Sequence, residues 1–157
     1  MRTATKPLSR KTFDAFYDAY AHRDVAKIRP FLDDDVRWTI NGPVELLHFC
    51  GTRHGPKAVL EVIERLVPEV FDIFSFVPEM ILVDGDCAST LSRLSARRCV
   101  DDRVISYRVA QFLRFRDGKV IEYCSVIDSF DAAEQVLGQR FDVKSDAAGI
   151  EAGVVAV

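Results

Sequence analysis

The fold is decided by residues 71–130, which read FDIFSFVPEMILVDGDCASTLSRLSARRCVDDRVISYRVAQFLRFRDGKVIEYCSVIDSF. Three short polar breaks divide this stretch: Asp84-Gly85-Asp86, Asp101-Asp102 and Asp117-Gly118. Asp-Gly between apolar runs is a strong hairpin signal, because glycine accepts the positive φ that a primed turn needs. The runs between the breaks are rich in Val, Ile, Phe, Tyr and Leu, which favour strands. The stretch therefore predicts a meander of four strands, at about 71–83, 87–100, 103–116 and 119–130.

The residues before the meander predict three helices and one strand. A first helix follows from apolar residues at i, i+3, i+4 and i+7, which give it an unusually aromatic face of Phe13, Phe16, Tyr17 and Tyr20. A short second helix covers 25–32 and contains Pro30, and a third begins at Gly55-Pro56 and ends at Pro68. Between them, alternating Val36, Trp38 and Ile40 predict a strand, and residues 44–54 are expected to be irregular.

This order of elements predicts an α+β fold, in which a curved antiparallel sheet wraps around the three N-terminal helices as a cone-shaped half-open barrel. A sheet curved over helices leaves a hollow, and such hollows are usual sites for small molecules. We expect one domain over residues 1–157, with its core at about 10–138. The weakly patterned tail at 140–157 is expected to be mobile or to lie over a partner subunit.

Composition narrows the class of protein. The 157 residues are 48% apolar and 29% charged with a net charge of −3, which is typical of a globular domain and gives no basic face for nucleic acid. The four cysteines show no Cys-x-x-Cys spacing, and the polar N-terminus does not read as a secretory signal. With no apolar run of membrane-spanning length, we expect a cytoplasmic protein that does not bind membranes.

The order and spacing of several short motifs resemble the nuclear transport factor two-like superfamily, in its SnoaL-like and ketosteroid-isomerase-like branch. The similarity covers about residues 13–130, and its motifs are 16–20, Asp24, 31–35, Val36-x-Trp38, Gly55, 83–86, 112–119 and 125–128. The resemblance implies a cone-shaped α+β barrel, a hydrophobic pocket between sheet and first helix, and a dimer through the outer sheet face. It does not imply one activity, because such folds carry isomerases, cyclases, dehydratases, epoxide hydrolases and non-catalytic binders.

The resemblance also argues against ketosteroid isomerase activity. The aspartate base of those enzymes aligns with Ile40, beside Asn41, and neither can remove a proton from carbon. Their Tyr and neutral Asp oxyanion donors align near Phe16 and Gln111, with Tyr17 as a substitute one residue away. Gln111 can still donate a hydrogen bond, but it cannot titrate.

Two residues are candidates for acid/base catalysis, Asp128 and His54. Asp128 lies near the place where SnoaL-like cyclases use an acidic residue, although strand alternation puts it on the outer face, where it would pair with Arg108 or cap the following helical turn. His54 lies in the irregular segment from which loops reach the mouth of a cone, and the alternative is a surface histidine. The same two interpretations apply to His48 in the same segment. The spacing of His48 and His54 is not that of a known metal-ligand pattern.

The ligand-binding candidates are the inward-facing aromatic and amide residues. If Gln111 faces the hollow, period-two alternation places Tyr107, Val109 and Leu113 beside it and Ile121, Tyr123, Ser125 and Ile127 on the next strand. The predicted ligand-binding set is Tyr17, Tyr20, Trp38, Tyr107, Gln111 and Tyr123, although plain core packing accounts equally well for Trp38.

Two functions follow from these residues. The first is a cofactor-independent and metal-free isomerase, cyclase or hydrolase acting on a small hydrophobic molecule. The second is a non-catalytic module for ligand binding or dimerisation, and a homodimer is expected through an outer sheet face that carries Phe112, Cys124 and Val126.

Overall fold

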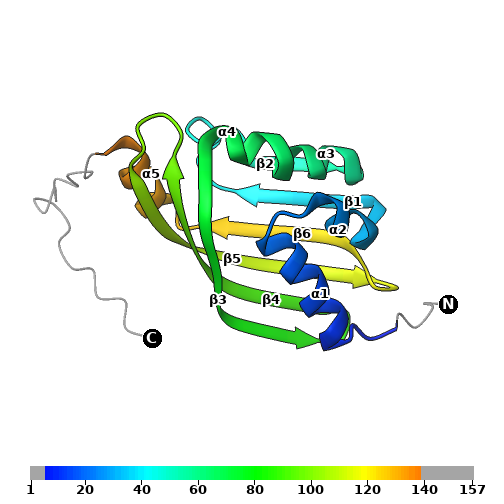
Figure 1. Ribbon diagram of the computed structural model, residues 1–157. Coiled ribbons are helices and arrows are strands. Elements are labelled where there is room, and N and C mark those ends of the chain that lie inside the picture. The colour runs from blue at the N-terminus through cyan, green and yellow to red at the C-terminus, as the bar shows by residue number, and fades with distance from the viewer. Residues whose placement is uncertain (1–5, 139–157) are drawn as a thin grey trace, which may run out of the picture.

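A computed structural model describes residues 6–138, which form a six-stranded curved sheet with helices packed on its concave side (Figure 1). The strand order is β2-β1-β6-β5-β4-β3, and the sheet does not close. The predicted α+β class and the curved sheet around N-terminal helices are confirmed. The predicted tail at 140–157 lies outside the described residues.

The meander forms as predicted, with strands β3 (Phe71–Asp84), β4 (Cys87–Arg98), β5 (Val104–Arg116) and β6 (Lys119–Ile127). Neighbouring strands pair antiparallel throughout. The turns contain the positive φ angles that their sequences indicate, with 57° at Gly85, 57° at Asp102, and 51° and 78° at Asp117 and Gly118. Two consecutive positive φ angles define a type I′ turn, whose twist matches that of the flanking strands.

Strand β1 (Leu32–Asn41) lies beside β6 and runs parallel to it, so the sheet is mixed rather than wholly antiparallel. Its other edge pairs antiparallel with a short strand β2 (Gly51–His54), in a segment that the sequence predicted to be irregular. The pairing with β1 makes these four residues a strand, because their own sequence carries no strand signal. Strand β1 also begins at Leu32, four residues earlier than the alternation at Val36 indicated.

The N-terminal helices follow the predicted positions closely. Helix α1 (Arg10–Ala21) is capped by Ser9, whose side chain accepts a hydrogen bond from the Thr12 amide. Helix α2 (Val25–Ile28) is capped in the same way by Asp24. A 3₁₀ turn, η1 (Arg29–Phe31), follows at Pro30 and leads into β1. The second helix is therefore short, as the proline predicted.

The third predicted helix continues two residues beyond Pro68. It consists of α3 (Gly55–Glu61), a π-helical turn η2 (Val62–Leu66) and α4 (Val67–Val70). Pro68 lies in the first turn of α4, directly after the π-helical turn. The prediction that the helix ends at Pro68 was therefore wrong.

A last helix, α5 (Ser129–Leu137), packs near the β4–β5 hairpin (Figure 1). The Gln135 side chain fixes it to β5, accepting from the Ser106 amide and donating to the Ser106 carbonyl. None of the helices within residues 6–138 combines the length and hydrophobicity needed to cross a bilayer.

The core lies between α1 and the concave sheet face. Phe13 and Phe16 of α1 pack edge-on against Phe115 of β5, with ring centroids 6.4 and 5.8 Å apart. Along β5 the alternate residues from Ile105 to Phe115 are buried, as period-two alternation predicted. On β6 a bulge inserts Ile121 opposite the Arg114/Phe115 step, so Val120 rather than Ile121 is buried. The placement of Ile121 on the inner face was therefore wrong.

Candidate functional site

A cavity of about 70 Å³ lies between α1, the α3–α4 helix and the concave sheet face. Most of its wall is apolar, and the polar contributions come from three tyrosines, one serine and one arginine. The lining residues are Tyr20, Ala21, Arg23, Ile40, Phe49, Ile63, Val67, Phe71, Ile73, Phe76, Leu94, Tyr107, Val109, Tyr123, Ser125 and Ile127. Among these lining residues, all within the described part of the chain, there is no carboxylate and no imidazole.

The partly exposed members of this wall mark its mouth. Tyr20 and Ala21 of α1 and Arg23 just after it are half-buried, as are Val67 of α4 and Ile73 and Phe76 of β3, whereas Tyr107, Tyr123 and Ser125 are fully buried. The cavity therefore runs from a mouth between α1, α4 and β3 to an inner end on β5 and β6.

Buried polar groups form a chain at the inner end. The Thr90 hydroxyl donates to Gln111 Oε1 over 2.6 Å, and Gln111 Nε2 donates to the Tyr123 hydroxyl over 2.8 Å. The Tyr123 and Tyr20 hydroxyls are 3.0 Å apart and form the next hydrogen bond of the chain. Gln111 therefore does not line the cavity itself, but it orients the phenol that does.

Tyr17 lies apart from the cavity wall. Its hydroxyl hydrogen-bonds the buried Ser92 hydroxyl at 2.5 Å, and its ring stacks on Phe13. The Ser92 hydroxyl lies 3.4 Å from both Thr90 Oγ1 and Gln111 Oε1, so Tyr17 belongs to the same buried network as Gln111. Such a network, once every member is paired, fixes side-chain positions.

Trp38 supports the cavity wall from behind. Its ring stacks on Tyr123 with centroids 3.6 Å apart and planes within 4°. The same ring contacts Tyr20 at 5.8 Å, and only 1% of Trp38 is exposed. Trp38 Nε1 is buried and has no hydrogen-bond partner among the described residues. Trp38 is thus a core residue that holds the two cavity-lining phenols in place.

Burial raises the pKa of each of these phenols, which are neutral near pH 7 even at the usual value of about 10. Burial raises the pKa of Tyr123, and hydrogen bonds from Tyr20, Gln111 and Ser125 only partly oppose it. The pKa of Tyr20 is raised well above its usual value, first by burial and then by repulsion from a Tyr123 phenolate. Burial also raises the pKa of Tyr107, and that of the neighbouring Cys50 thiol to about 11. Near neutral pH the cavity therefore presents hydroxyl donors and no base.

The two predicted acid/base residues lie elsewhere. Asp128 is exposed and caps α5, where its carboxylate accepts a hydrogen bond from the Asp131 amide over 3.3 Å. This is the capping role that was the alternative for Asp128. His54 is also exposed, ends β2 and precedes the first residue of α3. The structure does not bring either residue to the cavity wall.

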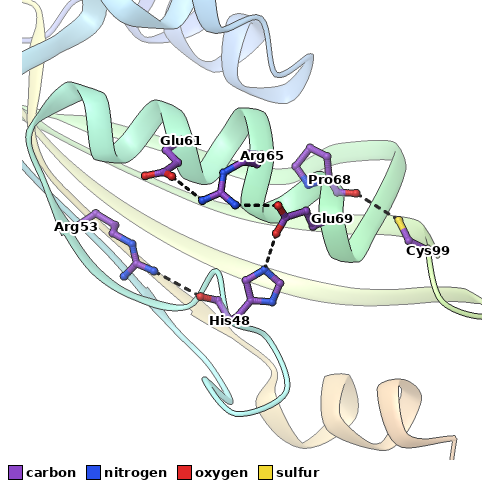
Figure 2. A network of polar contacts seen from close by, with 7 residues as sticks. All are labelled: His48, Arg53, Glu61, Arg65, Pro68, Glu69 and Cys99. Atoms are coloured by element: carbon purple, nitrogen blue, oxygen red, sulfur yellow. Dashed lines mark hydrogen bonds and ion pairs between the residues drawn. The ribbon is translucent and has the colours of Figure 1, made fainter.

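His48 belongs to a surface network rather than to the cavity (Figure 2). Its Nε2 lies 3.2 Å from Glu69 Oε2, and Arg65 bridges Glu69 and Glu61 over 2.8 and 2.6 Å. This network ties the segment before β2 to the α3–α4 helix. The next residue, Phe49, is buried and lines the cavity, so the network fixes part of the wall.

Two polar cavity residues were not singled out as site residues from the sequence, Arg23 and Ser125. Alternation placed Ser125 on the inner face but assigned it no role. Arg23 lies in the link between α1 and α2, and no local pattern points its side chain at the sheet. Of the positions aligned with ketosteroid isomerase residues, Ile40 lines the cavity, and the Asn41 amide donates to the Ser125 carbonyl over 3.0 Å. Within residues 6–138 no group of three or more His, Cys, Asp or Glu side chains is placed to hold a metal ion.

The fold agrees with comparisons to known proteins. Residues 13–123 match the model of the SnoaL-like domain, and the chain therefore belongs to this family within the nuclear transport factor two-like superfamily. A search of curated proteins found no match.

Solved structures show the same fold. A protein from Rhodopseudomonas palustris, named only as a candidate isomerase, is 32% identical over 81% of this chain and 93% of its own, with a TM-score of 0.71. TerC, co-crystallised with polyporic acid, is 19% identical over 81% of this chain and 96% of its own, with a TM-score of 0.70. A LEH-like epoxide hydrolase from M. tuberculosis is 16% identical over 82% of this chain and 88% of its own, with a TM-score of 0.64.

Proposed function

We propose that the protein binds a small, mainly apolar molecule carrying one acceptor oxygen, and that the hydrogen-bonded pair of Tyr20 and Tyr123 hydroxyls donates one hydrogen bond to that oxygen. The observation that supports this is a count of hydrogens at the inner end of the cavity. Tyr20 and Tyr123 each carry one hydroxyl hydrogen, and the hydrogen bond between them uses one of the two. Because Gln111 donates to Tyr123 rather than accepting from it, one hydroxyl hydrogen is left to donate to a ligand.

The size of the cavity limits the ligand. A dry cavity of about 150 Å³ holds benzene, and this one measures about 70 Å³. A ligand must therefore be smaller than a benzene ring or must displace side chains at the mouth. Phe76 and Ile73 are the partly exposed apolar groups there. A five-membered cyclic ketone is a suitable probe.

Titration with cyclopentanone and with cyclopentane tests the binding function. Trp38 is the single tryptophan and stacks on Tyr123, so its fluorescence reports directly on the cavity wall. We expect the ketone to bind more tightly than the hydrocarbon, by about fivefold to tenfold for one neutral hydrogen bond. The double variant Tyr20→Phe/Tyr123→Phe removes both hydroxyls and should abolish this preference, whereas Tyr107→Phe, in another part of the wall, should retain it. Equal affinity of the native protein for ketone and hydrocarbon would contradict the proposal.

A second candidate is isomerase-type chemistry without a cofactor, on the same kind of ligand. It is supported by the 32% identity to a candidate isomerase and by neutral phenols that could stabilise an oxygen on which negative charge develops. The sequence predicted that Asp128 or His54 transfers the proton. We propose instead that neither does so, because both are exposed and away from the cavity wall.

Exchange of the α-hydrogens of cyclopentanone in D₂O distinguishes the two candidates. An enzyme of this type accelerates the exchange, and the double variant Tyr20→Phe/Tyr123→Phe, which removes the donating pair, should slow it by about 100-fold, as loss of one oxyanion donor does elsewhere. Asp128→Asn and His54→Ala should leave the rate unchanged. Binding without accelerated exchange identifies a binding protein, which is the function that the absence of a base in the described cavity wall favours.

We further propose a cytoplasmic homodimer formed through the outer sheet face. Phe112 and Val126 lie on that face and are 53% and 46% exposed, and Cys124 is half-buried between them in the register of β5 and β6. Exposed apolar side chains that gather on one face are typical of a subunit interface. Light scattering coupled to size exclusion measures the assembly, and cell fractionation measures the location.

A further inference from the structure

We propose that Arg23 recognises a carboxylate at the mouth of the cavity, and that the ligand is therefore a small amphipathic acid whose apolar body enters the cone. This inference rests on the proposed binding function and names the chemical class of the ligand. Arg23 is the single charged residue among the described residues that line the cavity. The remaining lining residues are apolar or neutral.

The backbone places Arg23 at the mouth in an uncommon conformation. The Arg23 amide donates to the Tyr20 carbonyl and the Asp24 amide to the Ala19 carbonyl, over 3.0 and 2.9 Å. These two bonds form a Schellman motif at the end of α1, in which the residue after the cap takes a left-handed conformation. Glycine usually occupies that position, whereas here Arg23 has φ = 54°. An arginine held at a backbone position that favours glycine points to a role for its side chain.

The side chain spans the mouth. Arg23 Nη2 donates to the Ile73 carbonyl over 2.7 Å, which links the end of α1 to β3. Strand β3 is the edge of the sheet, and a register shift falls between Ile73 and Ser75. A carbonyl at such an edge accepts water as readily as a guanidinium, so this bond does not prevent Arg23 from turning to a ligand.

The charge of Arg23 has no counterion within the described residues. Arg93 and Arg108 both pair with Glu79, and Arg65 pairs with two glutamates. Arg23 donates only to a backbone carbonyl, so most of its five N–H donors remain for a ligand. A guanidinium beside an apolar cavity is poorly screened by water, and it binds a carboxylate through two parallel hydrogen bonds.

The two polar regions of the cavity therefore differ in what they bind. The phenols at the inner end accept or donate neutral hydrogen bonds, and Arg23 at the mouth supplies the positive charge. A branched short-chain acid such as 3-methylbutanoate would place a four-carbon apolar body, smaller than a benzene ring, in the cavity and its carboxylate at Arg23. Its amide, 3-methylbutanamide, has nearly the same shape and no charge.

Binding of this acid and amide, followed by Trp38 fluorescence at neutral pH, tests the assignment. We expect the native protein to bind the acid at least tenfold more tightly than the amide. Arg23→Gln and Arg23→Gly should reduce the preference to threefold or less without weakening amide binding. Arg23→Gly suits the left-handed backbone, so its fold is retained. Arg97→Gln is the matched control, because it removes one surface charge that likewise donates to a backbone carbonyl, and it should keep the full preference.

Three results would overturn the inference. If the native protein binds amide and acid equally, or if both Arg23 variants keep the preference, Arg23 does not select a carboxylate and the proposed binding function stands. If neither compound binds to the native protein, Arg23 does not select this acid; the proposed binding function then stands if cyclopentanone binds and fails if it does not.

Discussion

Replacement of Gln111 by leucine is the perturbation whose cost follows most directly from the structure. Gln111 is 1% exposed, accepts from Thr90 over 2.6 Å and donates to Tyr123 over 2.8 Å. Each lost hydrogen bond costs about 1 kcal/mol, and a buried group left without a partner adds about 1–3 kcal/mol. Thr90 can turn to Ser92, 3.4 Å away, and Tyr123 keeps its bond to Tyr20. We therefore expect Gln111→Leu to lower the free energy of unfolding by about 2–3 kcal/mol.

A double-mutant cycle identifies the cause of this loss. Thr90→Val alone leaves Gln111 Oε1 without its main donor. The double variant removes both partners and should cost about 1 kcal/mol less than the sum of the single changes, because paired apolar replacements leave fewer groups unsatisfied. Urea unfolding followed by Trp38 fluorescence gives the three free energies. A cost below about 0.5 kcal/mol for Gln111→Leu, or a strictly additive cycle, would refute the view of Gln111 as the centre of a buried polar network.

Three further predictions concern ionisation, capping and assembly. Burial raises the pKa values of all four tyrosines, which are Tyr17, Tyr20, Tyr107 and Tyr123. The stability that they contribute is therefore full below pH 10, and as the pH rises above 10 toward their folded-state pKa values the free energy of unfolding should fall by up to about 1.4 kcal/mol per pH unit for each tyrosine. A tyrosinate absorbance titration of the native protein with the usual midpoint near pH 10 would disprove this. Asp128→Ala should cost about 1 kcal/mol through loss of the α5 cap and leave cyclopentanone binding unchanged, and weaker binding at unchanged stability would instead favour a role in the site. Phe112→Glu should convert a dimer to monomers in light scattering, and an unchanged mass would place the interface elsewhere.

Much of the fold follows from local sequence signals. The Asp-Gly turns and the apolar runs between them predict β3 to β6, and period-two alternation predicts that Tyr107 and Gln111 face inward. The pairings that depend on distant residues could not be predicted in this way. Strand β2 forms because it lies beside β1. Ile121 is displaced from the inner face by a bulge that the sequence of β6 does not predict.

The site was predictable only where it lies on regular strands and helices. Tyr20 and Tyr123 were expected at the cavity from helix and strand periodicity, and the structure places both in its wall. Trp38 and Gln111 face inward but lie behind that wall, a distinction that requires three-dimensional packing. Arg23 reaches the mouth because its backbone takes a left-handed conformation. This conformation is rare for arginine, so the backbone preferences of the residue do not predict it.

The most direct test of a ligand-binding cavity is the isoleucine methyl spectrum of the protein in the presence of cyclopentanone. Four isoleucines line the cavity, and four others in the described chain do not and serve as internal controls. The first set is Ile40, Ile63, Ile73 and Ile127, and the second is Ile28, Ile81, Ile105 and Ile121. We predict saturable shifts of the first set that are several times larger than those of the second. Shifts of similar size in both sets, or no shift of the lining methyl groups at concentrations that saturate Trp38 fluorescence, would contradict the account.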